Sequence, residues 1–287
     1  MTDRSAIRFA PFPDPPAPAR SAATVELIRE SAGGIETYLM RRRKSKGAFG
    51  GAFVFPGGVV EPSDSAPEIR LRAVPPVMNG TEIPWPLFVA AIRETYEESG
   101  VLLADGAENL PRGLRSRVAD GSLPLAELAG TFGLTFRADR LLPAGRWITP
   151  LSEGRRFDAW FFLARMPGGQ EARPDGDELV EGLWMDPRKA LSEHGAGRLP
   201  LLPPTVFSLW QIARHGSWNA LAESVRRREI APMLPQPFYT DRELGVLLPG
   251  DPDYGIEAFR RAPRPGEPSR VVARDGRWEL MGFRGEG

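Results

Sequence analysis

The chain has 287 residues and a formal net charge of +0, with Lys+Arg 37 against Asp+Glu 37. This balance argues against a protein that chiefly binds a bare nucleic-acid backbone or an anionic membrane surface. Cys 0 excludes disulfides, thiolate metal sites and a cysteine nucleophile, and His 2 leaves little material for a histidine-based site. If the protein is an enzyme, carboxylates and arginines must carry its chemistry.

The first strands are predicted directly after a proline-rich lead-in, residues 1–20, which we expect to be extended. Ala23–Arg29 and Glu36–Arg42 have the composition of β-strands, and the small residues between them predict a hairpin. A short apolar strand, Ala52–Phe55, then runs into an expected glycine turn at Gly57-Gly58. The amino-terminal half of the fold therefore begins as a β-structure.

A helix is predicted over Leu87–Ser99, after an irregular segment that contains several prolines. Its apolar positions recur at helical spacing, and Gly100 is a candidate for its carboxyl-terminal cap. The later predicted helices are Leu123–Phe132, Asp186–Glu193, Thr205–His215 and Trp218–Arg228. The later predicted strands are Arg140–Ile148, Phe157–Ala164, Gly182–Met185 and a terminal hairpin, Val271–Ala273 with Arg277–Leu280, joined by a type I′ turn at Asp275-Gly276.

This succession of elements predicts one main domain over residues 21–198, with an insert at about 65–86. A C-terminal helical extension with the terminal hairpin follows over residues 199–287. No apolar run approaches the roughly 20 residues of a membrane-spanning helix, and no targeting segment is evident. We therefore expect a cytoplasmic protein.

Three carboxylates stand together on the predicted helix, at Glu94, Glu97 and Glu98. Their spacing of three and four residues places them on one helix face, where like charges repel. A divalent cation bound among them would reverse the sign of that interaction, since Mg²⁺ prefers oxygen ligands. The alternative is a solvated acidic face, and the three residues alone do not decide between the two.

The residues that flank this helix complete a wider pattern. Phe55-Pro56-Gly57-Gly58 precedes it, Arg93-Glu94 and Glu97-Glu98 lie on it, and Gly100-Val101 ends it. Together they resemble the Nudix box, the signature of hydrolases that act on a nucleoside diphosphate linked to another group. The resemblance covers residues 20–215 and predicts the Nudix fold, of the α/β (α+β) class, in which a mixed β-sheet is sandwiched between helices.

The pattern departs from the usual box at three points. Asp64 stands at the position of the first glutamate, and Thr95 stands at a position that is normally apolar. A long insert, Ser65–Ile92, replaces the usual seven residues between the first carboxylate and the Arg-Glu pair. The cost of closing a loop rises slowly with its length, so both ends of the box can still meet. A box divided here resembles the branch of the family that includes the peroxisomal CoA diphosphatase.

The resemblance implies hydrolysis of a phosphoanhydride with Mg²⁺ or Mn²⁺ as cofactor. It implies that Glu94, Glu97 and Glu98 are metal ligands, one of them also a candidate base, with Arg93 positioning a glutamate through an ion pair. Gly57 and Gly58 would shape the segment that carries metal or phosphate. A further base is expected outside the box, and the candidates are Glu178 and Glu181.

Several basic residues are candidates for substrate binding. The run Arg41, Arg42, Arg43, Lys44 and Lys46 could bind an extra phosphate, such as the 3′-phosphate of CoA, or could be a solvated strand end. Arg156 could contact phosphate or adenine, or form a charge pair on an edge strand. The lone histidines, His194 and His215, fit loop or helix-cap positions better than catalysis.

The expected substrate is a small nucleoside diphosphate derivative, with CoA or acyl-CoA first, which would yield 3′-phospho-AMP and a phosphopantetheine. ADP-ribose or a nucleotide sugar is the alternative substrate. A catalytically silent Nudix module that binds a nucleotide and regulates a partner is the alternative of another class. We expect neither a nucleic-acid nor a membrane partner, and a homodimer is compatible with the sequence.

Overall fold

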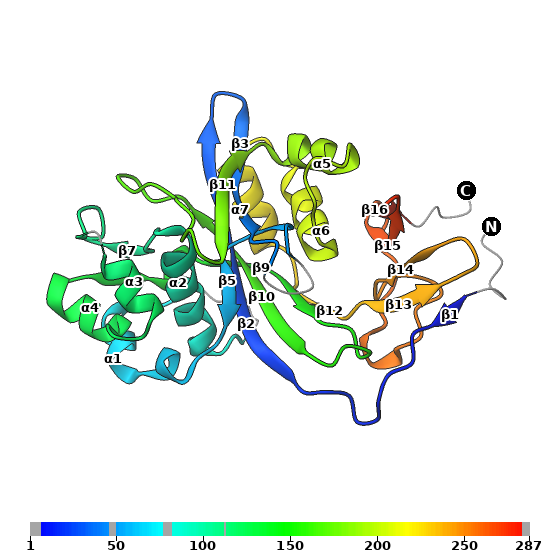
Figure 1. Cartoon of the computed structure of the whole chain (residues 1–287), viewed down its shortest axis with the longest axis horizontal. Helices are drawn as coiled ribbons and strands as arrows, with labels where there is room; N and C mark the ends of the chain where they lie inside the picture. The colour runs from blue at the N-terminus through cyan, green and yellow to red at the C-terminus, as the bar shows by residue number, and fades with distance from the viewer. Residues whose placement is uncertain (1–6, 46–49, 77–81, 112, 283–287) are drawn as a thin grey trace.

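The computed structural model describes residues 7–45, 50–76, 82–111 and 113–282. Its centre is a mixed sheet with the strand order β11-β3-β2-β10-β9-β12, in which β4 also pairs with β3 and β5 with β2 (Figure 1). The strands of this sheet are β2 (Ala19–Ser31), β3 (Gly34–Arg42), β4 (Phe53–Val54), β5 (Gly57–Val59), β9 (Leu142–Ile148), β10 (Arg156–Arg165), β11 (Leu179–Met185) and β12 (Pro232–Met233). β2 pairs in parallel with β10 and antiparallel with β3, so the expected mixed sheet is present.

Helices cover both faces of this sheet, as Figure 1 shows. The α-helices are α1 (Pro67–Arg70), α2 (Trp85–Ser99), α3 (Leu114–Ala119), α4 (Leu125–Phe132), α5 (Pro187–Gly195), α6 (Pro203–Ile212) and α7 (Trp218–Arg226), and the 3-10 helices are η2 (Pro62–Ser65), η3 (Ala138–Arg140) and η4 (Glu257–Phe259). Alternate residues of β2 face opposite sides. Val25 and Leu27 pack in the core that contains α2, whereas Ile28 packs in the core that contains Leu221 and Val225 of α7.

The predicted hairpins are both confirmed. β2 and β3 pair from Ile28 opposite Thr37 to Ser31 opposite Gly34. The terminal hairpin joins β15 to β16 through Asp275 and Gly276, whose φ angles of 49° and 74° are those that a type I′ turn requires.

The box insert has its own structure, which periodicity did not predict. α1 and β6 (Ala73–Val74) lie within it, and β6 joins a small sheet of order β6-β8-β7 with β7 (Ala104–Asp105) and β8 (Thr135–Arg137). The helix that follows starts two residues earlier than expected, because α2 begins at Trp85 and not at Leu87. Pro86 fits there, since the first turn of a helix does not need its missing N–H.

The C-terminal extension, expected to be helical with one hairpin, contains a larger antiparallel sheet. Its order is β1-β13-β14-β15-β16. The strands are β1 (Arg8–Phe9), β13 (Gln236–Tyr239), β14 (Leu244–Leu247), β15 (Pro268–Arg274) and β16 (Arg277–Gly282). The first of them comes from the proline-rich lead-in, so the two ends of the described chain meet in one sheet. Within the ranges described above, no helix is both long and apolar enough to cross a membrane.

Candidate active site

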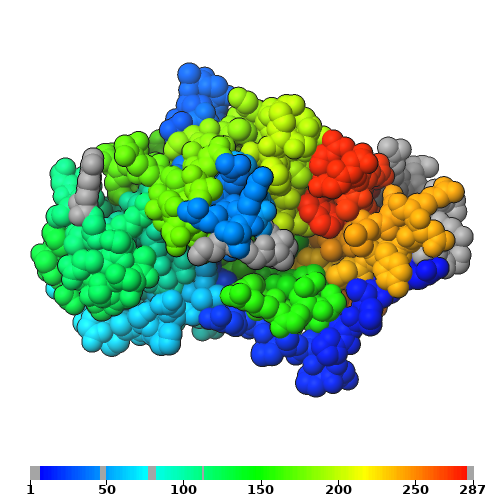
Figure 2. Space-filling view, in the orientation of Figure 1, coloured from blue at the N-terminus to red at the C-terminus, as the bar shows by residue number. Residues whose placement is uncertain are grey.

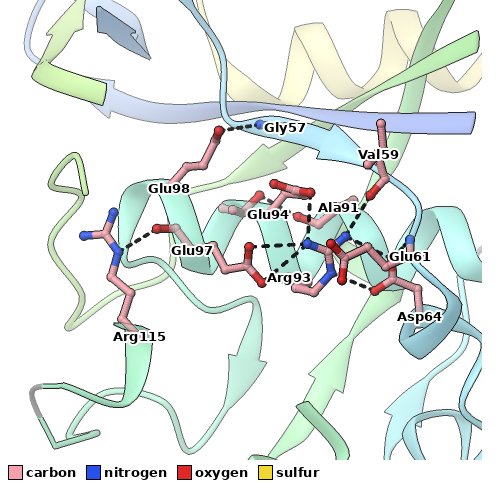
Figure 3. Close-up of polar contacts among 11 residues, drawn as sticks. Gly57, Val59, Glu61, Asp64, Ala91, Arg93, Glu94, Glu97, Glu98 and Arg115 are labelled. Carbon is pink, nitrogen blue, oxygen red and sulfur yellow. Dashed lines mark hydrogen bonds and ion pairs between the residues drawn. The ribbon is translucent and has the colours of Figure 1, made fainter. Parts of the chain in front are cut away.

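The predicted acidic helix is α2, and its packing decides which way its carboxylates face. Phe88, Ile92 and Tyr96 are buried in the core beneath it. The helix ends at Gly100, which adopts the left-handed conformation with a φ of 74° and donates its N–H to the carbonyl of Tyr96. With this face buried, the face that carries Glu94 and Glu98 lies beside β5 (Figure 3).

Arg93 joins the two halves of the divided box. Its guanidinium forms two hydrogen bonds with the Asp64 carboxylate, of 2.9 Å from Nε to Oδ1 and 3.0 Å from Nη2 to Oδ2. Nη2 also donates to the carbonyl of Val59, at 2.8 Å. Both charged side chains are buried, with exposed fractions of 7% and 1%. The shorter aspartate therefore reaches the arginine across the insert.

The three carboxylates of α2 divide into two directions. Glu98 turns toward β5, where its Oε2 accepts a 2.7 Å hydrogen bond from the Gly57 N–H. Glu97 turns toward Arg93, with 3.3 Å between its Oε2 and Nη1, and Glu94 lies between them, with its Oε1 2.9 Å from the same Nη1 (Figure 3). Because successive helix residues point about 100° apart, Glu97 and Glu98 diverge on either side of Glu94.

Burial raises the pKa values of all three carboxyl groups. For Glu94 the pKa rises to about 7, with burial the largest cause and Arg93 acting against it. Burial also raises the pKa of Glu97, again against Arg93. The pKa of Glu98 is raised well above its ordinary value by burial and then by the nearby charge of Glu94. Burial therefore favours the protonated form of these carboxyl groups, and a bound cation would favour their charged form.

The two glycines of the box form part of a strand. Gly57 and Gly58 lie in β5, which pairs with Thr24 and Ala23 of β2, so the expected glycine turn is wrong. Both positions require glycine because an added side chain would collide with neighbouring atoms. A Cβ at Gly57 would stand 2.4 Å from the carbonyl oxygen of Ala23, and one at Gly58 would stand 2.3 Å from Oε1 of Glu94. Only a bare backbone lets α2 approach the strand this closely.

A cavity of about 200 Å³ opens beside Glu98. Its wall is built from β2, β3, β4, β5, α2, β10, the start of β11 and the start of α6. The lining residues are Thr24, Arg42, Val54, Phe55, Gly57, Glu98, Phe161, Glu178, Leu179, Leu202, Pro204 and Thr205. The cavity combines carboxylates, an arginine and an apolar wall, as ligand sites commonly do.

The structure separates the two candidate bases outside the box. Glu178 lines the cavity with Glu98, and its negative charge contributes to the raised pKa of Glu98. Its Oε1 accepts a hydrogen bond from Nη2 of Arg42. Glu181 is not among the lining residues and forms an ion pair with Arg41 at 2.9 Å, with both side chains 40% exposed or more.

The arginines predicted to bind substrate have protein partners. Arg43 donates from Nε to the carbonyl of Asp177 and from Nη2 to that of Gly176. Arg156 is buried and donates to the carbonyls of Thr149, Pro150 and Ala17, which attaches the lead-in to the sheet. These contacts favour structural roles for Arg43 and Arg156. Lys44 is exposed, and Lys46 lies outside the described residues.

Sequence reasoning missed the residues that tertiary packing brings to the cavity. Arg42 was part of the basic run, and its Nε atom is buried without a hydrogen-bond partner among the described residues. Thr24 and Phe161 come from adjacent parallel strands, and their register pairs them directly. Leu202, Pro204 and Thr205 come from the extension. The strand pattern could have predicted the position of Thr24. No local sequence pattern predicts that the start of α6 lies near β5.

The donor chemistry at α2 fits a divalent ion, although the side chains do not converge on one point. Among the residues the structure describes, no three acidic or histidine side chains lie close enough together to hold a metal as they stand. The reason is visible in the contacts above: Arg93 and the Gly57 N–H hold the three carboxylates apart. The donors are nevertheless crowded, largely buried oxygen ligands of the kind that Mg²⁺ and Mn²⁺ prefer.

Comparisons with known proteins place the chain in a family. A family model described as the NUDT19 Nudix domain matches residues 79–212, which include α2. A crystal structure of a NUDIX hydrolase from Alicyclobacillus acidocaldarius is 31% identical in sequence, with a TM-score of 0.65 over 72% of this chain and 96% of that chain. The chain belongs to the Nudix hydrolase family.

Two relatives carry a more specific name. The acyl-coenzyme A diphosphatase NUDT19 of Gallus gallus is 29% identical over 76% of this chain and 74% of its own length. The human protein of the same name is 27% identical over 77% of this chain and 72% of its own length. This Nudix hydrolase therefore resembles CoA diphosphatases, as the divided box predicted, and its mixed sheet between helices is the Nudix fold.

Proposed function

We propose that this Nudix hydrolase uses a divalent metal ion to cleave the phosphoanhydride bond of CoA or acyl-CoA, giving 3′-phospho-AMP and a phosphopantetheine. One observation carries the proposal. Glu94 and Glu98 contact the glycine backbone of β5, and Glu98 lines a cavity together with Glu178. ADP-ribose or a nucleotide sugar is the alternative substrate.

Glu94, Glu97 and Glu98 are the proposed ligands of Mg²⁺ or Mn²⁺. The ion, when bound, lowers the pKa of a coordinated water and neutralises charge on the phosphoryl oxygens. Arg93 keeps the helix and the first half of the box in register through its bonds to Asp64 and Val59. Loss of this arginine would leave several buried carboxylates without a cation.

Glu178 is the proposed general base, since it borders the same cavity as Glu98 and comes from a different segment. A base must lie within hydrogen-bond reach of the water that it deprotonates, and Glu181 does not line this cavity. Arg42 holds the Glu178 carboxylate through Nη2, and its Nε, which has no hydrogen-bond partner in the described part of the chain, is a donor for a phosphate oxygen.

The choice of CoA rests on the activity named for two relatives and on the arginines of β3. Arg42 lines the cavity and Arg41 precedes it on that strand, and although each pairs with a glutamate, such arginines suit a substrate with an extra phosphate. The apolar cavity wall at Phe161, Leu202 and Pro204 suits a pantetheine or acyl group. A cytoplasmic location, a homodimer and the absence of nucleic-acid or membrane partners remain predictions.

A substrate panel tests the proposal. CoA, an acyl-CoA, ADP-ribose and a nucleotide sugar are incubated with the protein and Mg²⁺ or Mn²⁺, and products are resolved by mass. We expect 3′-phospho-AMP from CoA, with a higher kcat/KM than for the other substrates. A clear preference for ADP-ribose or a nucleotide sugar would support the alternative substrate.

A catalytically silent nucleotide-binding module is tested with the same panel. Such a module would bind a nucleotide with no turnover of any substrate in the presence of metal. The Glu178→Gln variant is the matched probe, because it keeps the shape of the side chain and removes its basicity. We expect it to lower kcat about 100-fold or more, while the Glu181→Gln variant retains wild-type turnover.

A further inference from the structure

A second cavity lies on the side of the molecule that carries α6 and α7. It has a volume of about 350 Å³ and is bounded by these two helices and the segment 264–267. That volume falls within the roughly 300–1,000 Å³ of small-molecule sites. None of its lining residues lines the cavity beside Glu98. The sheet lies between α7 and α2 (Figure 1), so this cavity is separate from the candidate active site.

Arginines dominate the charge of this cavity. Arg214, Arg228 and Arg264 line it together with Glu267, which is the only carboxylate among the lining residues. Glu267 is chiefly the partner of Arg261, at 2.9 Å, and lies 3.7 Å from Arg264. The cavity therefore has more positive than negative charge.

Among the residues that the structure describes, Arg214 and Arg228 have no ion pair, and the ion pair of Arg264 with Glu267 is long. Arg214 lies over the ring of Trp210, 4.9 Å from its centroid, and no ion pair of it is found there. Arg228 donates only long bonds, of 3.3 Å to the carbonyl of Ala144 and 3.5 Å to Oε1 of Gln211. Guanidinium groups are strong hydrogen-bond donors, and most of the N–H groups of these arginines are unused in the described ranges.

The arginines also lie within electrostatic reach of one another. Burial lowers the pKa of Arg228; the charges of Glu26 and Glu267 raise it, and those of Arg264 and Arg214 lower it. Burial lowers the pKa of His215, another lining residue, and the charges of Arg214 and Arg228 add to this effect. Keeping like charges together costs free energy, and a bound anion would offset this cost.

We propose that this cavity is an anion site for a phosphate group, either free or as a phosphate monoester, held by Arg214, Arg228 and Arg264. Arg228 contributes from the inner wall, and the more exposed Arg214 and Arg264 contribute from the mouth. The hydroxyl of Ser224 and the amide of Gln211 are further polar groups of the wall. Trp210 and Leu221 provide an apolar surface for the organic part of an ester.

Titration calorimetry on the full chain tests the site, with EDTA present to suppress metal-dependent binding at α2. The probes are inorganic phosphate and adenosine 3′,5′-bisphosphate, at constant ionic strength with chloride as the competing anion. We expect both to bind, and the Arg264→Gln and Arg214→Gln variants each to raise Kd about fivefold or more, because each removes a charge-assisted hydrogen bond. A tighter bisphosphate would identify an ester as the ligand, and equal affinity would identify free phosphate.

Two matched variants separate this site from other basic surfaces. Arg117→Gln removes the same charge from an exposed position on α3 and is expected to leave Kd unchanged. Glu98→Gln alters the candidate active site and is expected to leave phosphate affinity unchanged as well. No binding by the wild type, or equal affinity in the wild type and both cavity variants, would overturn the proposal.

Discussion

Gly58 shows how one missing side chain can set the geometry of the candidate site. The atom nearest to an added Cβ is Oε1 of Glu94, at 2.3 Å, and the next two also belong to that carboxyl group. A glutamate side chain can turn away, whereas a backbone cannot. Substitution of Gly58 should therefore disturb function more than folding.

We expect Gly58→Ala to lower kcat/KM about tenfold or more, because the Glu94 carboxylate must leave its present place. The thermal unfolding midpoint should change by only a few degrees. Gly33→Ala is the control, since nothing lies within 4 Å of its added Cβ. Steady-state kinetics and thermal denaturation of the two variants check the prediction, and unchanged kinetics for Gly58→Ala would contradict it.

Glu26 is a buried carboxyl group on the α6 side of β2, and burial raises its pKa from 4.5 to about 7. Ser208, through a hydrogen bond, and Arg228, through its charge, act in the opposite direction. The folded protein therefore keeps a proton on Glu26 at pH values where the unfolded chain has released it. The resulting stabilisation is complete below about pH 4.5 and is lost as the pH rises through 7.

The Glu26→Gln variant should lack this part of the pH dependence. Its free energy of unfolding should exceed that of the wild type at pH 8, by about 3 kcal/mol at most. The exposed Glu68→Gln variant should follow the wild-type curve. Urea unfolding between pH 5 and 8 measures all three, and parallel curves for the wild type and Glu26→Gln would contradict the assignment.

At the scale of elements, the box insert supports the structure beneath α2. Ile69 of α1 is 3% exposed and belongs to the same core as Phe88, whereas its neighbour Leu71 is 86% exposed. None of the residues that line the cavity at Glu98 comes from the described part of the insert. These facts favour a structural role for α1 over that of a lid.

Ile69→Ala should therefore cost about 2–4 kcal/mol of stability, as buried isoleucine truncations do, with KM unchanged. Leu71→Ala should be nearly neutral in both measurements. Chemical denaturation and steady-state kinetics at a temperature where both variants are folded decide the matter. A large rise in KM for Ile69→Ala without loss of stability would indicate that the insert shapes the substrate site.

The elements that could be predicted from sequence are those with strong local patterns. α2, the β2–β3 hairpin and the terminal hairpin follow from periodicity, glycine caps and turn residues. β5 was missed because a Gly-Gly pair predicts a turn, and only its pairing with β2 makes it a strand. The short strands β13 and β14 were missed because each is only four residues long, although they pair with each other across a short connection.

The candidate site was predictable in composition but not in arrangement. The divided box pointed to Asp64, Arg93 and the three glutamates, and the family resemblance left Glu178 and Glu181 as two candidates for a further base. Only the fold separates these last two, since a register shift lies between Leu179 and Glu181. The expected convergence of three carboxylates is altered by Arg93, whose hydrogen bonds no linear pattern describes.

At the scale of the whole molecule, the extension is part of one structure with the main domain. A single hydrophobic cluster contains Leu39 and Phe161 of the central sheet, Phe207 of α6 and Val271 of β15. Phe207 also packs edge-on against Trp147 of β9, with ring centroids 5.5 Å apart. The extension, moreover, supplies one wall of the cavity beside Glu98.

We therefore expect the full chain to unfold in one cooperative transition. Tryptophan fluorescence, which reports on Trp147 in this shared core, and far-UV circular dichroism should give the same urea midpoint. Two separate transitions would show that the extension folds apart from the main domain, contrary to the continuity of the core.

The most direct test of the account is the metal dependence of CoA hydrolysis in the Glu98→Gln variant. Wild-type kcat/KM should rise and saturate with Mn²⁺ or Mg²⁺. The Glu98→Gln variant should lose about 100-fold or more in kcat/KM while it remains folded, and Glu181→Gln should match the wild type. Metal-dependent turnover in Glu98→Gln equal to that of the wild type would contradict the proposed site.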